Sequence, residues 1–252
     1  MKNVITTLGL FCSIISSAAY SQINTTVKAI SYEPDEAWQS FRLPKITLVN
    51  EVNDHSTVWS VLTPGTVSII SERVARLLYA DVNAAPSLPI LNITLKEMKG
   101  VAYKDGDFKS ASIFISREYL ENFQKKNGQQ EAYDELVGIL FHEIAHAYQY
   151  DDKNYEEIGP IIEGIADLVR LKAGYISQSA QKAGGNYDSG YKTTAFYLHW
   201  LELNSNEDYL VKINESLSPY DDVKWSWPYF AKRFGVSLEA SWSEYQKQLG
   251  DK

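Results

Sequence analysis

Two histidines four residues apart, with a glutamate beside the first, are the residues of this sequence best suited to chemistry. They lie in residues 140–146 (LFHEIAH). Residues four apart on a helix lie one turn above each other, so His142 and His146 can bind one ion. Zinc accepts imidazole nitrogen and keeps a position for water, from which Glu143 can take a proton. This H-E-x-x-H pattern predicts a zinc-dependent hydrolase.

The competing interpretation is a buried helix in which these three side chains only make hydrogen bonds within the core. Apolar residues recur through residues 133–145 near the spacing of an amphipathic helix. This periodicity places the motif on one helix, as a metal site requires, and we therefore favour the metal site.

A catalytic zinc ion usually has three protein ligands, so a third should come from another segment. Residues 161–167 (IIEGIAD) offer Glu163 and Asp167, one turn apart on one helix face. Pro160 suits the first position of that helix and Gly174 its end. We predict that Glu163 binds the metal and Asp167 accepts the outer N–H of a ligating histidine. The reverse assignment is the alternative, and the apolar surroundings argue against a solvated acidic face.

Residues 1–21 have the order of a secretory signal peptide. A positive start precedes an apolar run over residues 4–15, and small residues follow. The run is shorter than the roughly 20 residues that span a bilayer. We predict cleavage after Ser21, with Ala19 as the alternative site, and a secreted or periplasmic protein. A retained anchor is the alternative to cleavage.

The composition excludes several classes of function. The sequence has 252 residues and a formal net charge of −8, which offers nucleic acid and anionic lipid no attraction. We therefore predict no nucleic-acid partner and, after signal cleavage, no membrane. The one cysteine, Cys12, lies in the signal segment, so the mature chain should have no disulfide, thiolate ligand or cysteine nucleophile. Oligomeric state is left open.

Strand patterns come before helix patterns along the chain, which predicts an α+β fold. The predicted strands cover residues 46–49, 91–95, 101–103 and 112–116, the last two as a hairpin with its turn at residues 104–107. Helices are predicted at residues 66–79, 189–203 and 238–249, besides the two with the candidate ligands. We predict one domain over residues 45–252 after an N-terminal arm over residues 22–44, which is also a candidate pro-segment.

Two stretches resemble the plant basic secretory protein family, a group of zincin-like peptidases with bacterial members. They are residues 142–150 (HEIAHAYQY) and residues 162–175 (IEGIADLVRLKAGY). Shorter similar pieces lie at residues 100–103, 190–195 and 237–245. The resemblance covers about residues 45–248, although this chain is acidic, with a pI near 5.1.

The resemblance implies a zincin-like fold, in which a small mixed sheet packs on the helix with the two histidines, and extracellular proteolysis. In zincins an edge strand binds the substrate in extended form, and residues 112–116 or 100–103 could supply it. Tyr191 and His199 are candidate donors to the oxyanion of the reaction. We assign His55 no role.

We predict a secreted zinc peptidase acting on a peptide or protein substrate. The ligands are His142, His146 and Glu163, and Glu143 is the general base and then the proton donor to the leaving amine. The alternative is a catalytically silent binding protein of the same fold, with a glycan or protein partner. A zinc hydrolase of non-peptide amides is a third option. Three asparagines also begin Asn-x-Ser/Thr triplets, namely Asn24, Asn92 and Asn214.

Overall fold

The structure, a computed structural model, describes residues 23–30, 38–52, 57–205 and 208–250. The predicted signal peptide over residues 1–21 and His55 lie outside the described residues. Within them, no helix is both long enough and apolar enough to span a lipid bilayer.

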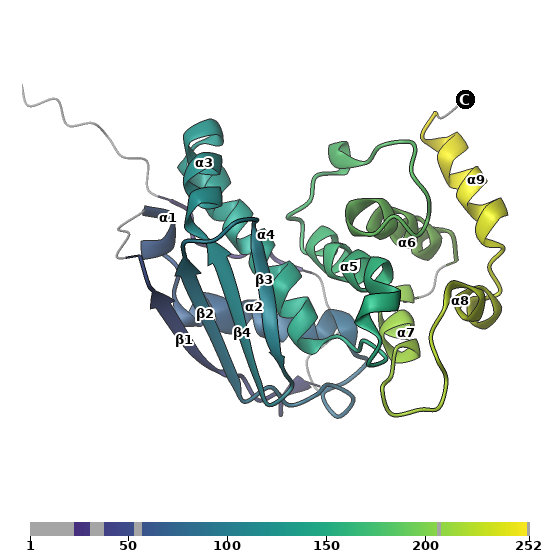
Figure 1. The fold of residues 1–252 in the computed structure, drawn as a ribbon, viewed down its shortest axis with the longest axis horizontal. Helices are drawn as coiled ribbons and strands as arrows, with labels where there is room; N and C mark the ends of the chain where they lie inside the picture. The colour runs from purple at the N-terminus through teal and green to yellow at the C-terminus, as the bar shows by residue number, and fades with distance from the viewer. Residues whose placement is uncertain (1–22, 31–37, 53–56, 206–207, 251–252) are drawn as a thin grey trace, which may run out of the picture.

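A mixed sheet forms one side of the molecule and helices α5 to α9 form the other, with α4 between them (Figure 1). The strands are β1 (Lys45–Asn50), β2 (Ile90–Lys96), β3 (Ala102–Asp107) and β4 (Ser110–Ser116). The helices are α1 (Thr57–Ser60), α2 (Pro64–Leu78), α3 (Arg117–Asn127), α4 (Gln129–Tyr148), α5 (Tyr155–Lys172), α6 (Tyr191–Ser205), α7 (Tyr209–Ser216), α8 (Trp227–Phe234) and α9 (Leu238–Gln248). The predicted mixed α+β class is confirmed.

The four strands lie in the order β1-β2-β4-β3. β1, β2 and β4 are parallel, and β3 runs antiparallel to β4 at one edge. Of the two candidates for the substrate-binding edge, residues 112–116 are therefore excluded, because β4 pairs on both sides. The other candidate, residues 100–103, leads into β3, which is an edge strand.

The predicted hairpin is confirmed, but its turn lies further along the chain than expected. Residues 104–107 are part of β3, and the chain turns at Phe108 and Lys109. Gly106 permits this, because a Cβ there would lie 2.1 Å from the Ser110 carbonyl oxygen. A side-chain oxygen of Asp107 accepts the N–H groups of Lys109 and Ser110 and closes the turn.

Helix α4 lies in the core, because it packs against the sheet, α2 and α5. Its second half is buried around most of its circumference, with Leu140, Phe141 and Ile144 fully inaccessible. Apolar residues on every side of a helix indicate burial on every side. The two histidines therefore lie on a helix that the surrounding core holds rigidly.

Helix α5 begins at Tyr155, five residues before the predicted start at Pro160. Pro160 lies inside this helix, where its missing N–H removes one intrahelical hydrogen bond and its ring crowds the preceding turn. Proline is more favourable at a first helical position, which is why the sequence indicated a start there. The prediction that Gly174 terminates this helix is confirmed, since Gly174 follows the C-cap with a φ of 79°. At Gly164, a Cβ would lie 2.5 Å from the Thr194 side chain of α6, so α5 and α6 pack unusually closely there.

Residues 23–30 of the N-terminal arm contact the start of α4 and the segment that follows α5. The Asn24 N–H donates to Gln130 at the start of α4. The Lys28 ammonium group donates to the Gly174 carbonyl, and the Lys28 backbone N–H donates to the Tyr175 hydroxyl. Residues 23–30 thereby connect the start of α4 to the end of α5.

Candidate metal centre

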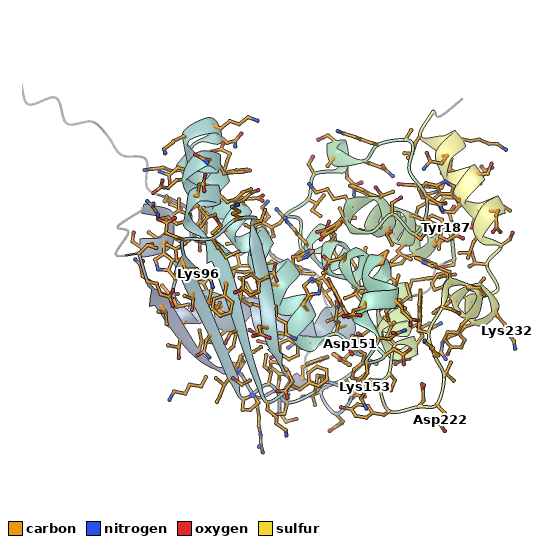
Figure 2. The ribbon with its side chains drawn as sticks, viewed as in Figure 1. Lys96, Asp151, Lys153, Tyr187, Asp222 and Lys232 are labelled. Carbon is orange, nitrogen blue, oxygen red and sulfur yellow. The ribbon has the colours of Figure 1, made fainter. Side chains whose placement is uncertain are left out.

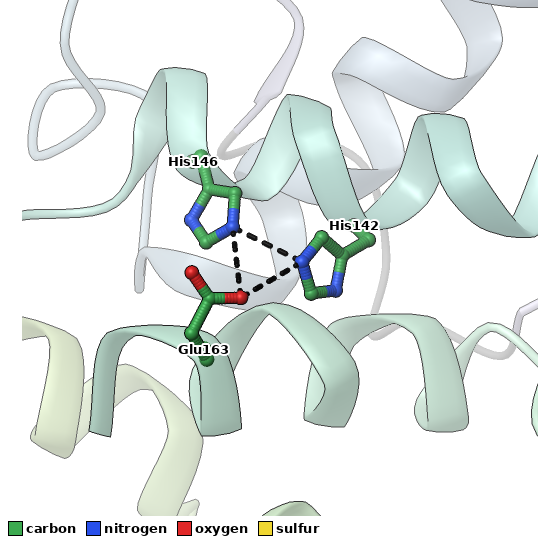
Figure 3. A group of neighbouring side chains, drawn as sticks. All are labelled: His142, His146 and Glu163. Atoms are coloured by element: carbon green, nitrogen blue, oxygen red, sulfur yellow. Dashed lines mark hydrogen bonds and ion pairs between the residues drawn. The ribbon is translucent and has the colours of Figure 1, made fainter. Parts of the chain in front are cut away.

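The three predicted ligands meet at one point between α4 and α5 (Figure 3). Nε2 of His142 lies 3.1 Å from Nε2 of His146 and 3.2 Å from Oε2 of Glu163. Nε2 of His146 lies 3.6 Å from the same oxygen. The three side chains are only 12–14% exposed. Because these atoms all lie within 4.8 Å of one another, one metal ion could contact them all.

Asp167 contacts the ring of His142 on the side away from the centre, as predicted from the sequence. Its Oδ1 is 2.9 Å from Nδ1 of His142, so the ring donates that N–H and keeps Nε2 directed at the centre. Burial opposes a charge on this ring, but Asp167 and Glu163 outweigh it and raise the pKa of His142 to about 9. For His146, burial dominates and lowers the pKa.

Two further side chains contact the ligands and were missed in the sequence. The Tyr155 hydroxyl donates to Oε1 of Glu163 at 2.6 Å, and the Gln149 amide nitrogen lies 3.2 Å from Nδ1 of His146. Gln149 stands three residues after His146, a helical spacing that could have identified it. Tyr155 carried no such signal, because the predicted start of α5 at Pro160 left it outside the helix.

Glu143 differs from the other acids of the centre because one carboxylate oxygen has no partner. Its side chain is buried, and its Oε2 makes no hydrogen bond to any described residue. Burial raises the pKa of Glu143 to about 7, with Glu163 adding to the rise while His142 and Lys104 oppose it. A carboxylate with such a pKa can exchange protons near neutrality.

The centre opens into a cavity of about 1250 Å³ between β3 on one side and α5 with the start of α6 on the other. Side chains along one face of α4, from Glu135 to His146, line its floor. Lys104 of β3 also lines it, and burial lowers the pKa of its ammonium group. Asp151 and Lys153 lie in the segment after α4 (Figure 2) and line the cavity near the loop after β3.

Exposed tyrosines gather at this cavity. Tyr103, Tyr155, Tyr191 and Tyr220 are the tyrosines with the largest exposure among the described residues, from 43% to 73%, and all four line it. The other tyrosines and all tryptophans of the described residues belong to the core or pack against it, so the cavity stands out by offering an aromatic surface to a bound chain.

At one end the cavity is lined by a half-buried ion pair between α4 and α5. The Arg170 guanidinium donates to Glu135 at 2.6 Å, and the Tyr119 hydroxyl donates to the other oxygen of Glu135 at 2.8 Å. A Cβ at Gly138 would lie 2.7 Å from Nε of Arg170, so this glycine makes room for the guanidinium. The pair joins α3, α4 and α5 beside the centre.

The two candidate oxyanion donors lie in different places. The Tyr191 ring lies parallel to that of His142, with centroids 6.2 Å apart, and lines the cavity. Its φ of 45° is uncommon for a bulky residue, and such strain is frequent at functional sites. His199 instead contacts Glu202 at 3.4 Å on α6 and does not line the cavity. Its placement therefore gives no support to a catalytic role.

Fold and site together describe a mixed α+β protein with two histidines and a glutamate converging in a large cleft. Residues 59–245 match the model of the BSP family, described as peptidases of plants and bacteria. The chain belongs to this family, which confirms the resemblance to the basic secretory proteins. No curated protein and no solved structure matches the chain significantly.

Proposed function

We propose that this chain is a secreted zinc-dependent peptidase with a zincin-like fold. The membership of a peptidase family and the His-His-Glu cluster support hydrolysis assisted by a metal. The apolar run in residues 4–15, with the small residues after it, supports secretion.

The donor set suits zinc in type and spacing. Zinc binds imidazole nitrogen and carboxylate oxygen at about 2.0–2.2 Å in tetrahedral sites, which separates neighbouring ligand atoms by roughly 3.3 Å. The separations here are 3.1, 3.2 and 3.6 Å. Zinc bound to His142, His146 and Glu163 would lower the pKa of a water molecule to about 7.

The observation that carries the enzymatic function is the unpartnered oxygen of Glu143 beside the ligands. A buried acceptor without a partner costs about 1–3 kcal/mol, so a purely structural centre gains nothing from it. Here Glu143 takes a proton from the attacking water and returns it to the amine nitrogen as the peptide bond breaks. We assign the donor to the developing oxyanion to Tyr191, which lies beside His142 and lines the cavity.

The substrate that we propose is a peptide or protein bound in extended form along the cleft. β3 is an edge strand whose residues line the cleft, so its free backbone groups can pair with an added strand. The four exposed tyrosines supply contact area for substrate side chains.

Cleavage of a peptide library tests this function. The protein beginning at Gln22 would be loaded with zinc and compared with Glu143→Gln, each with and without a chelator. We expect cleavage only by the zinc-loaded wild type.

If both proteins bind zinc in equal amounts and neither cuts any peptide, the centre belongs to a binding protein and the peptidase proposal is wrong. Cleavage of small amides without cleavage of peptides would instead assign a non-peptide substrate. Equal cleavage by both proteins would exclude Glu143 as the base.

A further inference from the structure

Each of the three ligand side chains is held by a different partner, through the atom that it does not direct at the centre. His142 uses Nδ1 to bond Asp167 at 2.9 Å. The equivalent atom of His146 lies 3.2 Å from Gln149, and Oε1 of Glu163 accepts from Tyr155 at 2.6 Å. Partners of this kind orient metal ligands and tune the affinity of the site.

We propose that Gln149 and Tyr155 are positioning residues that set the metal affinity of the centre and the number of oxygens that Glu163 contributes. This inference rests on the proposed metal site but not on peptidase activity, so the two can fail separately. Neither residue has a ligand atom in the cluster itself.

Tyr155 controls how Glu163 can bind. Its hydroxyl occupies Oε1 and leaves Oε2 beside both histidines. The carboxylate is thereby restricted to one ligand atom, so three protein atoms surround the centre. A catalytic zinc site has this number of protein ligands and keeps a position open. Without the hydroxyl, Oε1 is free to turn towards the metal and fill that position.

Gln149 determines the tautomer of His146. A ring that binds metal through Nε2 carries its proton on Nδ1, so its partner must accept a hydrogen bond. The amide nitrogen of Gln149 now faces Nδ1 and donates to the Ile162 carbonyl, while the amide oxygen is buried without a partner. A half-turn of the amide brings that oxygen to Nδ1. We infer that metal binding to His146 requires this orientation, at the cost of the bond to Ile162.

Zinc affinity measured by competition with a chromophoric chelator tests the proposal without any activity assay. The variants are Tyr155→Phe and Gln149→Met, which keep the size of each side chain but remove its polar atoms. Tyr220→Phe is the matched control, because Tyr220 lines the same cavity and contacts none of the ligands. We expect zinc to dissociate about 10–100-fold more readily from each variant and equally from the control.

Cobalt substitution gives a second signal that simple packing would not change. Tetrahedral Co²⁺ absorbs visible light more strongly than five-coordinate Co²⁺, so Tyr155→Phe should weaken the absorption as Glu163 binds through both oxygens. Gln149→Met should keep the wild-type spectrum at saturating cobalt. Wild-type zinc affinity and an unchanged spectrum in Tyr155→Phe would overturn its role, and wild-type affinity in Gln149→Met would overturn that of Gln149. A wild type that binds no zinc would instead defeat the proposed metal site.

Discussion

Helices α4 and α5 each bring a buried glutamate to the centre, yet their surroundings differ. On α4, Glu143 has an oxygen with no partner, and burial raises its pKa to about 7. On α5, Glu163 is bonded to His142 and Tyr155, and these bonds lower its pKa although burial opposes the shift. One carboxylate is therefore suited to accept a proton and the other to remain charged as a ligand.

The difference shows that the neighbours of an acid, more than its type or burial, decide what it does. The two acids that α5 brings to the centre both have hydrogen-bond partners, whereas Oε2 of Glu143 on α4 has none among the described residues. Asp167 is bonded to His142, and Glu163 to His142 and Tyr155. Hydrogen bonds to the charged form lower a carboxylate pKa, whereas burial without them raises it.

The largest effect should come from Glu143→Gln, which removes the base but keeps the shape of the side chain. We expect kcat to fall about 10²–10⁴-fold, because a positioned acid–base group contributes this much. Zinc content should not change, since Glu143 is not part of the ligand cluster. Kinetics on a cleaved library peptide, beside metal analysis, would measure both. Loss of zinc from Glu143→Gln would show that Glu143 also holds the metal and would contradict the separate roles of the two glutamates.

The converse variant, Glu163→Gln, should lose the metal first. We expect zinc affinity to fall more than the roughly 100-fold that loss of an outer partner can cause, because a ligand itself is removed. The midpoint of thermal unfolding should then no longer rise when zinc is added. Glu157→Gln is the control, because Glu157 lies exposed in the first turn of the same helix and pairs with Lys224. Equal zinc affinity in Glu163→Gln and Glu157→Gln would contradict the ligand assignment.

Two glycines of α5 test how strongly the position of Glu163 depends on the close packing of α5 against α6. Gly164→Ala would place a methyl group 2.5 Å from the buried Thr194 side chain, so α5 must move beside Glu163. We expect the free energy of unfolding to fall by about 1–3 kcal/mol, a typical cost of overpacking. Apart from its chain neighbours, a Cβ at Gly159 meets nothing within 4 Å. Because a Cβ before Pro160 disfavours the helical backbone, Gly159→Ala should bring no stabilisation but should cost less than Gly164→Ala. Denaturant unfolding of both variants measures these changes. Equal free energies of unfolding would show that α6 moves away from the added methyl group at little cost.

The two histidines of the candidate metal cluster could be predicted from the sequence because their spacing is a local property. His142 and His146 are one helical turn apart on any helix, and the apolar residues around Glu163 signalled burial. The α+β class also followed from local periodicity. The order of the strands did not, because β4 became central only through pairing with β2, some twenty residues earlier in the chain.

Two partners of the ligands were missed although each lies on or directly beside the helix of its ligand: Tyr155 is on α5 with Glu163, and Gln149 directly follows α4. The bond from Tyr155 to Glu163 needs the first turn of α5, which Pro160 concealed in the sequence. The triplet at Asn214 shows the same limit, since its side chain is fully buried and bonds the Leu78 carbonyl. A sequence pattern suggests a chemical role, but burial decides whether the residue can perform it.

The smallest effect should come from His199→Gln, set beside Tyr191→Phe. His199 contacts Glu202, which also pairs with Lys172, so its substitution disturbs a contact between α5 and α6 away from the cleft. We expect kcat to stay within about twofold, whereas loss of an oxyanion donor costs about 10²–10³-fold and is expected for Tyr191→Phe. Steady-state kinetics on one peptide compares the two. A large loss in His199→Gln with normal stability would mean that α6 moves when substrate binds and brings this ring to the centre.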